Sequence, residues 1–220
     1  MKLKFVFVTP TFATFFRMTR YDVVIYGATG FTGSYIVERL VTSEHYKGVT
    51  FAIAGRNQSK LQHTLETVSK KTGKDLKSTP IIIADSADEA SLAEMAKKAK
   101  VILNAVGPYR LYGEAVVKAA VENGASHVDI SGEPAVRYFD YENEFPSTIF
   151  WLFQFLEKMQ MLYGEKAKEK GVYVVGACGW DSIPCDMGVN FVKEHFDGDV
   201  NHIESFVQMN SGPSVRSLIF

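Results

Sequence analysis

The stretch YDVVIYGATGFTGSYIVERL, residues 21–40, decides the fold. It opens with an apolar run and closes with an amphipathic segment, and Gly27, Gly30 and Gly33 stand three apart at the junction. A strand, a glycine-rich turn and a helix in this order favour dinucleotide binding. In such a turn Gly27 leads the chain sharply out of the strand, Gly30 leaves room for a diphosphate, and Gly33 lets the helix pack closely on the sheet.

The start of that helix is the predicted anion site. Its free N–H groups and the positive end of its dipole face the phosphates of a bound dinucleotide. The spacing is GxxGxxG rather than GxGxxG, but it still places all three glycines in the turn. The alternative is a glycine-rich turn that binds no ligand. The cofactor-binding residues predicted here are Gly27, Thr29, Gly30, Phe31, Thr32 and Gly33.

The rest of the chain alternates strand and helix patterns. The strands are continuous apolar runs, which are typical of a parallel sheet covered on both faces. We therefore expect an α/β fold, a Rossmann-type doubly wound parallel sheet, whose ligands bind beyond the carboxyl ends of the strands. Strands are predicted over 22–26, 49–54, 80–84, 101–106, 126–130 and 171–177. Helices are predicted near 31–43, 58–72, 89–99, 113–123, 154–170 and 184–195.

The residues after the second strand bear on which dinucleotide binds. An NAD site usually carries Asp or Glu there, for the ribose 2′-hydroxyl. This chain reads AIAGRNQSK over residues 52–60, with no acid and with Arg56 directly after Gly55. Because a guanidinium suits a 2′-phosphate, NADP is favoured over NAD. Lys60 is a weaker second candidate, and the alternative is that Arg56 is a solvated loop charge.

Two further strand ends supply candidates for the cofactor site. Asp85 follows the third strand, where an adenine amino group can be met, but Ser86 and Glu89 could instead form a capping box that only starts a helix. After the fourth strand, a glycine again allows the backbone to approach the middle of the cofactor, although Gly-Pro by itself simply marks a turn. The residues concerned are Asn104, Gly107 and Pro108.

Composition excludes several classes of function. The 24 Lys and Arg nearly balance the 25 Asp and Glu, for a net charge of −1, so there is no basic footprint for nucleic acid. Cys178 and Cys185 cannot form a zinc framework alone, and we predict no metal site. Both are interpreted as small core residues rather than nucleophiles, in a reducing, cytoplasmic compartment.

Two segments lie outside the repeating pattern. Residues 1–17 hold two lysines and an apolar run broken by Pro10, which is too short to span a membrane. Met18 stands just before the first strand, so we expect a leader extension or a mis-assigned start, in preference to a cleaved signal peptide.

Residues 135–153 are rich in aromatic side chains and fit neither the helix period nor the strand period. They are interpreted as an insertion that packs on the domain or is an exposed, aggregation-prone stretch, in preference to one that contacts a membrane surface or partner.

Four blocks together resemble one family: GATGFTG (27–33), AGR (54–56), NAVGPYRLYGEAVVKAAVENGASHVDISGE (104–133) and GWDSIPCDMG (179–188). They are similar to the saccharopine dehydrogenase-like oxidoreductases over about residues 18–210, apart from the insertion. The resemblance implies an NADP-binding Rossmann domain and an oxidoreductase of unknown substrate. It also implies links to lipid or glycolipid metabolism and association with lipid droplets or membranes, but it does not carry over a lysine-pathway substrate.

The chain departs from the pattern of that family in two places. The family joins SGEP almost directly to QFLEKMQ, and its members continue beyond residue 220 into a second α+β domain. We therefore expect an altered or shortened product, with its own catalysis in doubt. The expected divisions are a leader at 1–17, the Rossmann NADP-binding domain at 18–134, the insertion at 135–153, the remainder of that domain at 154–200 and the start of a substrate domain at 201–220.

Hydride transfer needs the nicotinamide held against a substrate and a group that manages a proton. Glu133 and Asp181 follow predicted strands and are the catalytic acid–base candidates, although Asp181 or Ser182 could simply cap the next helix. The expected partners are a small-molecule substrate, a lipid-droplet or membrane surface and a second copy of the chain. The rival function is a non-catalytic, dinucleotide-binding or lipid-associated scaffold. A short-chain reductase is disfavoured, because no Tyr-x-x-x-Lys pair follows the fourth strand.

Overall fold

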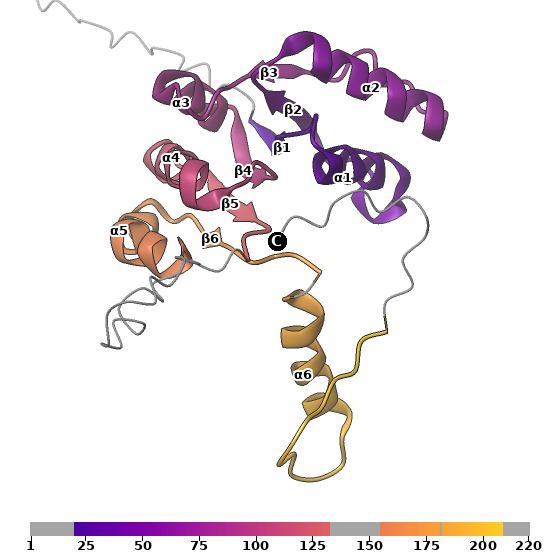
Figure 1. Ribbon diagram of the computed structural model, residues 1–220, viewed down its shortest axis with the longest axis vertical. Helices are drawn as coiled ribbons and strands as arrows, with labels where there is room; N and C mark the ends of the chain where they lie inside the picture. Colours follow the sequence, from indigo (N-terminus) through magenta and orange to yellow (C-terminus); the bar gives the residue numbers. More distant parts are fainter. Residues whose placement is uncertain (1–19, 133–154, 181, 209–220) are drawn as a thin grey trace, which may run out of the picture.

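Residues 20–132, 155–180 and 182–208 are described in the computed structural model of the chain. Within them, six parallel strands form one sheet in the order β3-β2-β1-β4-β5-β6 (Figure 1). This is the strand order of a dinucleotide-binding Rossmann fold, so the predicted fold class is confirmed. The strands are β1 Tyr21–Tyr26, β2 Phe51–Gly55, β3 Ile81–Ile83, β4 Ala99–Asn104, β5 Ser126–Asp129 and β6 Val174–Val175.

The helices follow the strands and begin at identifiable caps. Asn57 accepts a hydrogen bond from the Lys60 N–H at the start of α2, and Asp88 accepts from the first N–H groups of α3. The alternative of a capping box formed by Ser86 and Glu89 is therefore wrong, because the Asp88 side chain already accepts hydrogen bonds from the Ala90 and Ser91 N–H groups. The helices are α1 Phe31–Thr42, α2 Gln58–Thr72, α3 Glu89–Lys97, α4 Tyr109–Glu122, α5 Phe155–Lys170 and α6 Ile183–His195, with a short 3₁₀ turn at Glu44–Tyr46.

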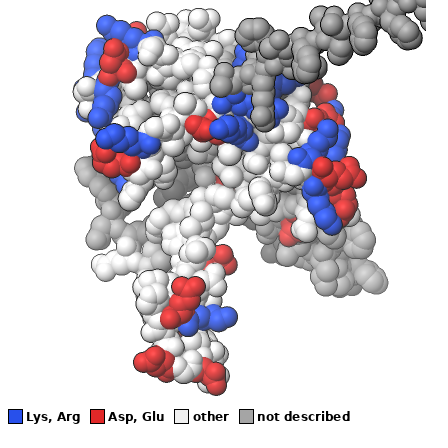
Figure 2. All heavy atoms as spheres, turned by 180° about the vertical axis from the view of Figure 1, so that it is seen from behind, with Lys and Arg blue, Asp and Glu red and all other residues white. Residues whose placement is uncertain are grey.

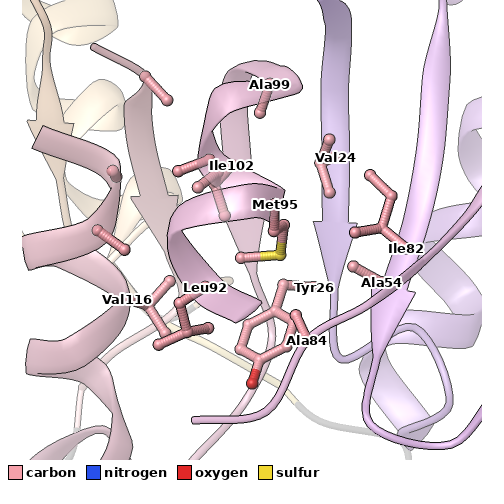
Figure 3. Packing of buried hydrophobic residues seen from close by; sticks show 14 of the residues in the cluster. Val24, Tyr26, Ala54, Ile82, Ala84, Leu92, Met95, Ala99, Ile102 and Val116 are labelled. Atoms are coloured by element: carbon pink, nitrogen blue, oxygen red, sulfur yellow. The ribbon is translucent and has the colours of Figure 1, made fainter. Parts of the chain in front are cut away.

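Each face of the sheet is covered by its own apolar layer. On one face, Val24 and Ile102 of the central strands pack against Met95 of α3 and Val116 of α4 (Figure 3). On the other face, α1 and α2 cover β1 and β2 through a second cluster. Because both faces are buried, the strands need apolar side chains in both directions. The members of the second cluster are Ile25, Ala28, Val37, Ile53, Leu61, Leu65, Val68 and Leu76.

The strand register brings the predicted site to one edge of the sheet. Tyr26 at the end of β1 pairs with Ala54 of β2 and with Asn104 of β4. The glycine turn, the residues after β2 and the loop after β4 therefore leave the sheet side by side. The strand order reverses between β1 and β4, and doubly wound sheets bind their ligands at such a switch point.

Two elements differ from the sequence prediction. Helix α4 begins at Tyr109 rather than near residue 113, because the buried Tyr109 hydroxyl donates to the Asn104 carbonyl oxygen at 2.9 Å and holds the first turn in place. Strand β6 is reduced to Val174–Val175. The chain turns immediately afterwards, at Ala177, whose φ of 52° lies in the left-handed region.

Helix α6 extends away from the sheet (Figure 1) and buries none of its residues. Its apolar side chains include Met187 and Phe191, which are 56% and 62% exposed. Among the described residues, no helix combines the length and the apolar run needed to cross a membrane. The predicted leader and insertion, and the end of the predicted substrate domain, lie outside the described residues, so the predicted domain boundaries remain predictions.

Candidate dinucleotide-binding site

The fold itself requires two of the three glycines in the turn. Gly27 has a φ of 87°, and a Cβ there would lie 2.7 Å from the Val106 Cγ2 atom. A Cβ on Gly33 would collide with the Gly27 carbonyl oxygen and lie 2.8 Å from the Ala28 Cα. The first turn of α1 can therefore rest on the end of β1 only because Gly33 has no side chain.

Gly30 is different, because a side chain there would meet a single tight contact rather than a collision. Its φ is −77°, and a Cβ would approach only the Gly27 carbonyl oxygen, at 3.3 Å. It is the N-cap residue of α1, where no side chain caps the helix and the first turn holds no acidic residue. The N–H groups at this helix start suit an anion. Around them, the side chains of Thr29, Phe31 and Thr32 are exposed.

The ends of β1, β2 and β3 place three polar groups around the Tyr26 hydroxyl. This buried hydroxyl is 2.9 Å from the Ser86 Oγ atom. Burial raises the pKa of Tyr26; the Ser86 hydrogen bond and the Arg56 charge lower it, and the Asp85 charge raises it further. Arg56 and Asp85 therefore lie at the same corner of the sheet.

Arg56 is the available cation at that corner. Its side chain is exposed, and among the described residues it forms no ion pair. One oxygen of the Asp85 carboxylate already makes a hydrogen bond within the protein, because its Oδ1 atom accepts from the Ala87 N–H at 3.0 Å. A free guanidinium with no acid at the end of β2 suits a phosphate better than a ribose hydroxyl. The residues present thus fit NADP.

Asn104 shapes the loop after β4 from beneath. It is fully buried, and its Oδ1 atom accepts from the Val106 N–H at 3.0 Å while its Nδ2 atom lies 3.4 Å from the His127 Nε2 atom. These contacts use the side chain within the protein, which favours a loop-shaping role over direct contact with a ligand. Gly107 and Pro108, joined by a cis peptide bond, are exposed above it.

His127, which lies beside the strand-end residue Asp129 in β5, was missed as a candidate by the sequence analysis. His127 is fully buried, and burial lowers its pKa to about 4, against the opposing effect of Asp129. Its Nδ1 atom has no hydrogen-bond partner among the described residues and lies 3.8 Å from the Asp129 Oδ2 atom. The available signal was the SHVD pattern, because residues two apart in a strand share one face of the sheet.

Lowering the pH from 7 to 5 is expected to reduce the free energy of unfolding by about 2 kcal/mol through His127 alone. Its pKa of about 4 in the folded chain compares with about 6.5 in an unfolded chain. Below pH 6.5 the unfolded state takes up the proton first, so the stabilisation present at neutral pH falls progressively toward pH 4. Urea unfolding at pH 7, 6 and 5 measures this loss. The His127→Gln variant is expected to show a flatter pH dependence, and an unchanged slope would contradict the assignment.

The predicted acid–base residues Glu133 and Asp181 lie outside the described residues. Of the two cysteines, Cys185 is exposed, so its interpretation as a core residue is wrong, since α6 packs on nothing described. Cys178 is partly buried, and burial raises the pKa of its thiol, which disfavours a nucleophilic thiolate. Within the described ranges, no cluster of three potential metal ligands occurs.

The surface charges are mixed in sign. On the face that Figure 2 shows, Lys and Arg side chains lie beside Asp and Glu side chains. Several form ion pairs, including Lys118 with Glu89 at 2.9 Å and Lys71 with Glu38 at 2.7 Å. This face therefore presents no broad field of one sign of the kind that nucleic acid binding uses.

Comparisons with known proteins agree with this geometry. The family model "Saccharopine dehydrogenase NADP binding domain" matches residues 23–175. The chain is 62% identical over 197 residues to "Lipid droplet localized protein" of Caenorhabditis elegans, covering 90% of this chain and 42% of the relative. It is 45% identical over 204 residues to "Saccharopine dehydrogenase-like oxidoreductase" of Homo sapiens, covering 90% and 43%. The chain thus spans less than half the length of these curated relatives.

A solved structure supports the fold independently. The apo, histidine-tagged saccharopine dehydrogenase (L-Glu forming) of Saccharomyces cerevisiae aligns with a TM-score of 0.53 at 17% identity, covering 79% of this chain and 31% of that one. At this identity the likeness concerns the fold alone. The family assignment rests on the matched family model, which spans the sheet from β1 to β6. The chain therefore belongs to the saccharopine dehydrogenase family and carries its NADP-binding domain.

Proposed function

We propose that this chain binds NADP(H) at the carboxyl edge of the sheet as the cofactor domain of an oxidoreductase. The diphosphate lies at the uncapped start of α1, beside Gly30, and the 2′-phosphate lies on Arg56. The observation that carries the proposal is the contrast within the turn: a Cβ on Gly27 or Gly33 would collide with the fold, whereas a Cβ on Gly30 would meet only the Gly27 carbonyl oxygen, at 3.3 Å. A ligand that approaches the backbone accounts for a third glycine at this position.

Each remaining residue of the predicted site has a proposed task. The Asp85 carboxylate accepts a hydrogen bond from the adenine amino group. Gly107 and Pro108, both exposed after β4, line the path toward the nicotinamide, and Asn104 fixes their loop from below through Val106. Glu133 and Asp181 are proposed to hold or move the proton that accompanies hydride transfer. When bound, the cofactor supplies the hydride acceptor or donor.

A second function is favoured by a separate observation. The relative at 62% identity is named for the lipid droplet, and α6 exposes Met187, Phe191 and other apolar side chains. A non-catalytic scaffold on a lipid-droplet or membrane surface would use such a helix. The two functions separate in one assay: only an oxidoreductase changes NADPH absorbance when a substrate is added.

Calorimetric titration of the 220-residue chain with NADPH and NADH tests the site, and Gly30→Val is its sharpest variant. We expect the valine to weaken NADPH binding about 100-fold, because it takes the place of a phosphate that receives charge-assisted hydrogen bonds. The variant should lose about 1 kcal/mol of stability, because valine is a poorer N-cap residue than glycine and its Cβ would lie 3.3 Å from the Gly27 carbonyl oxygen.

Gly188→Val is the matched control for this titration. It adds the same side chain in α6, where nothing lies within 4 Å of the glycine, and should leave NADPH affinity unchanged. An unaltered affinity in Gly30→Val would move the diphosphate away from this turn. If a folded wild-type chain bound neither nucleotide, the scaffold would become the leading function.

A further inference from the structure

Helix α5 contains a glycine that nothing in the described structure requires. The helix lies along α4 and β6 at the end of the sheet (Figure 1), and Gly164 stands in its interior. A Cβ there would meet only the Gln160 Cγ atom, at 3.8 Å. By contrast, a Cβ on Gly113 of α4 would lie 2.5 Å from the Phe155 ring. A glycine inside a helix is destabilising relative to alanine, so Gly164 calls for another explanation.

The missing side chain of Gly164 leaves a groove open between α5 and the last strands. The groove has a volume of about 540 Å³, which lies within the range of small-molecule sites. Its walls are mostly apolar and come from α5, from the residues around β6 and from Val117 of α4, and Lys168 of α5 also lines the groove. Among the lining residues are Leu156, Met159, Val172, Val174 and Val175.

A buried carboxylate also lines this groove. Asp129 is 2% exposed, and its Oδ1 atom accepts from the Ser131 N–H at 2.9 Å and the Ala177 N–H at 3.2 Å. Its Oδ2 atom lies 3.8 Å from His127, which burial keeps neutral at pH 7 by lowering its pKa. No Lys or Arg among the described residues pairs with Asp129. A buried carboxylate is stabilised by hydrogen-bond donors or cations and repels anions.

We propose that this groove binds a single-chain amphiphile whose head group donates hydrogen bonds and carries no negative charge. The alkyl chain lies along the apolar walls beside Gly164, and a hydroxyl or ammonium head contacts Asp129. The site is separate from the dinucleotide site, because none of its lining residues comes from the glycine turn or from Arg56. It therefore goes beyond the proposed cofactor function and does not depend on it.

The test uses three probes of equal chain length: 1-decanol, decylamine and decanoate. Calorimetry at pH 7 with the 220-residue chain is expected to detect the alcohol and the protonated amine, with decanoate at least tenfold weaker. Gly164→Phe fills the groove and should weaken binding of the first two at least tenfold. Met161→Phe, on the exposed surface of the same helix, is the matched control and should bind as the wild type does.

Two further measurements keep the outcome decisive. NADPH affinity should be the same in Gly164→Phe as in the wild type, which separates this site from the cofactor site. Asp129→Asn retains an Oδ1 acceptor for its two N–H partners but removes the charge. The ratio of decanoate affinity to decylamine affinity should therefore rise at least tenfold. Equal binding of all three probes, or binding that Gly164→Phe leaves intact, would overturn the proposal. If Gly164→Phe fails to fold, the change in probe preference in Asp129→Asn tests the proposal, and an unchanged preference would overturn it.

Discussion

Gly33→Ala is expected to lower the free energy of unfolding by about 3 kcal/mol and the melting temperature by roughly 10 °C. The added methyl would collide with the Gly27 carbonyl oxygen and press on the Ala28 Cα. Both are backbone atoms at the end of the central strand, so relief requires α1 to move away from the sheet. The movement would uncover part of the apolar layer that Val37 and its neighbours bury.

The sign of this effect is what makes it diagnostic. Replacing a glycine by alanine within a helix normally stabilises a protein by up to about 1 kcal/mol, so a large loss identifies steric exclusion. Urea unfolding followed by circular dichroism measures the change. Gly30→Ala is the control, because its Cβ would meet only the Gly27 carbonyl oxygen, at 3.3 Å, and it should cost about 1 kcal/mol, clearly less than Gly33→Ala. A neutral or stabilising Gly33→Ala would show that α1 does not rest on β1 as described.

Arg56→Asp is expected to weaken NADPH binding about 100-fold while NADH binding is kept or improved. The wild-type guanidinium is exposed and forms no ion pair with a described residue, so it is available to a 2′-phosphate. Charge-assisted hydrogen bonds contribute about 1.5–3 kcal/mol each, and each 1.4 kcal/mol is a factor of ten in affinity. The new carboxylate repels the 2′-phosphate but can accept a hydrogen bond from a ribose hydroxyl.

Lys60→Asp is the matched control for this reversal. Lys60 is also exposed and lies near the start of α2, three residues after its N-cap. Lys60→Asp makes the same change of charge as Arg56→Asp, and we expect it to alter NADPH affinity only a few-fold. Parallel calorimetric titrations with NADPH and NADH give the ratio of affinities for each variant. If both variants weakened NADPH binding equally, Arg56 would act only through its charge and not through a specific contact. If the ratio of NADPH to NADH affinity were unchanged in Arg56→Asp, the 2′-phosphate would bind elsewhere.

The sequence predicted the sheet well because its strands are continuous apolar runs joined by clear helix patterns. Prediction was weaker where a tertiary contact decides the outcome. The start of α4 depends on Tyr109 reaching the Asn104 carbonyl oxygen, and local pattern does not contain this contact. The sequence analysis named Ser86 as the possible cap of α3, whereas in the structure Asp88 caps this helix and Ser86 contacts the Tyr26 hydroxyl.

The candidate site was predictable in its position but not in its supporting contacts. The glycine spacing and Arg56 suffice to place the turn and the cation at one edge, because parallel strands end together. His127 escaped notice, since a single histidine in a short strand is ordinary until its burial and its neighbour Asp129 are known. The binding roles of the individual residues remain predictions that the titrations above address.

The order of the strands also has a consequence for the making of this protein on the ribosome. β1 forms its first pair with β2, only 25 residues later, but its other side waits for β4, which ends at residue 104. Until then the emerging chain presents Val23, Val24 and Ile25 along an open strand edge. Such an edge readily recruits other extended chains, and nascent multistrand proteins aggregate through it. Translation of the segment between β2 and β4 is therefore a stage at which this central strand is open to such pairing.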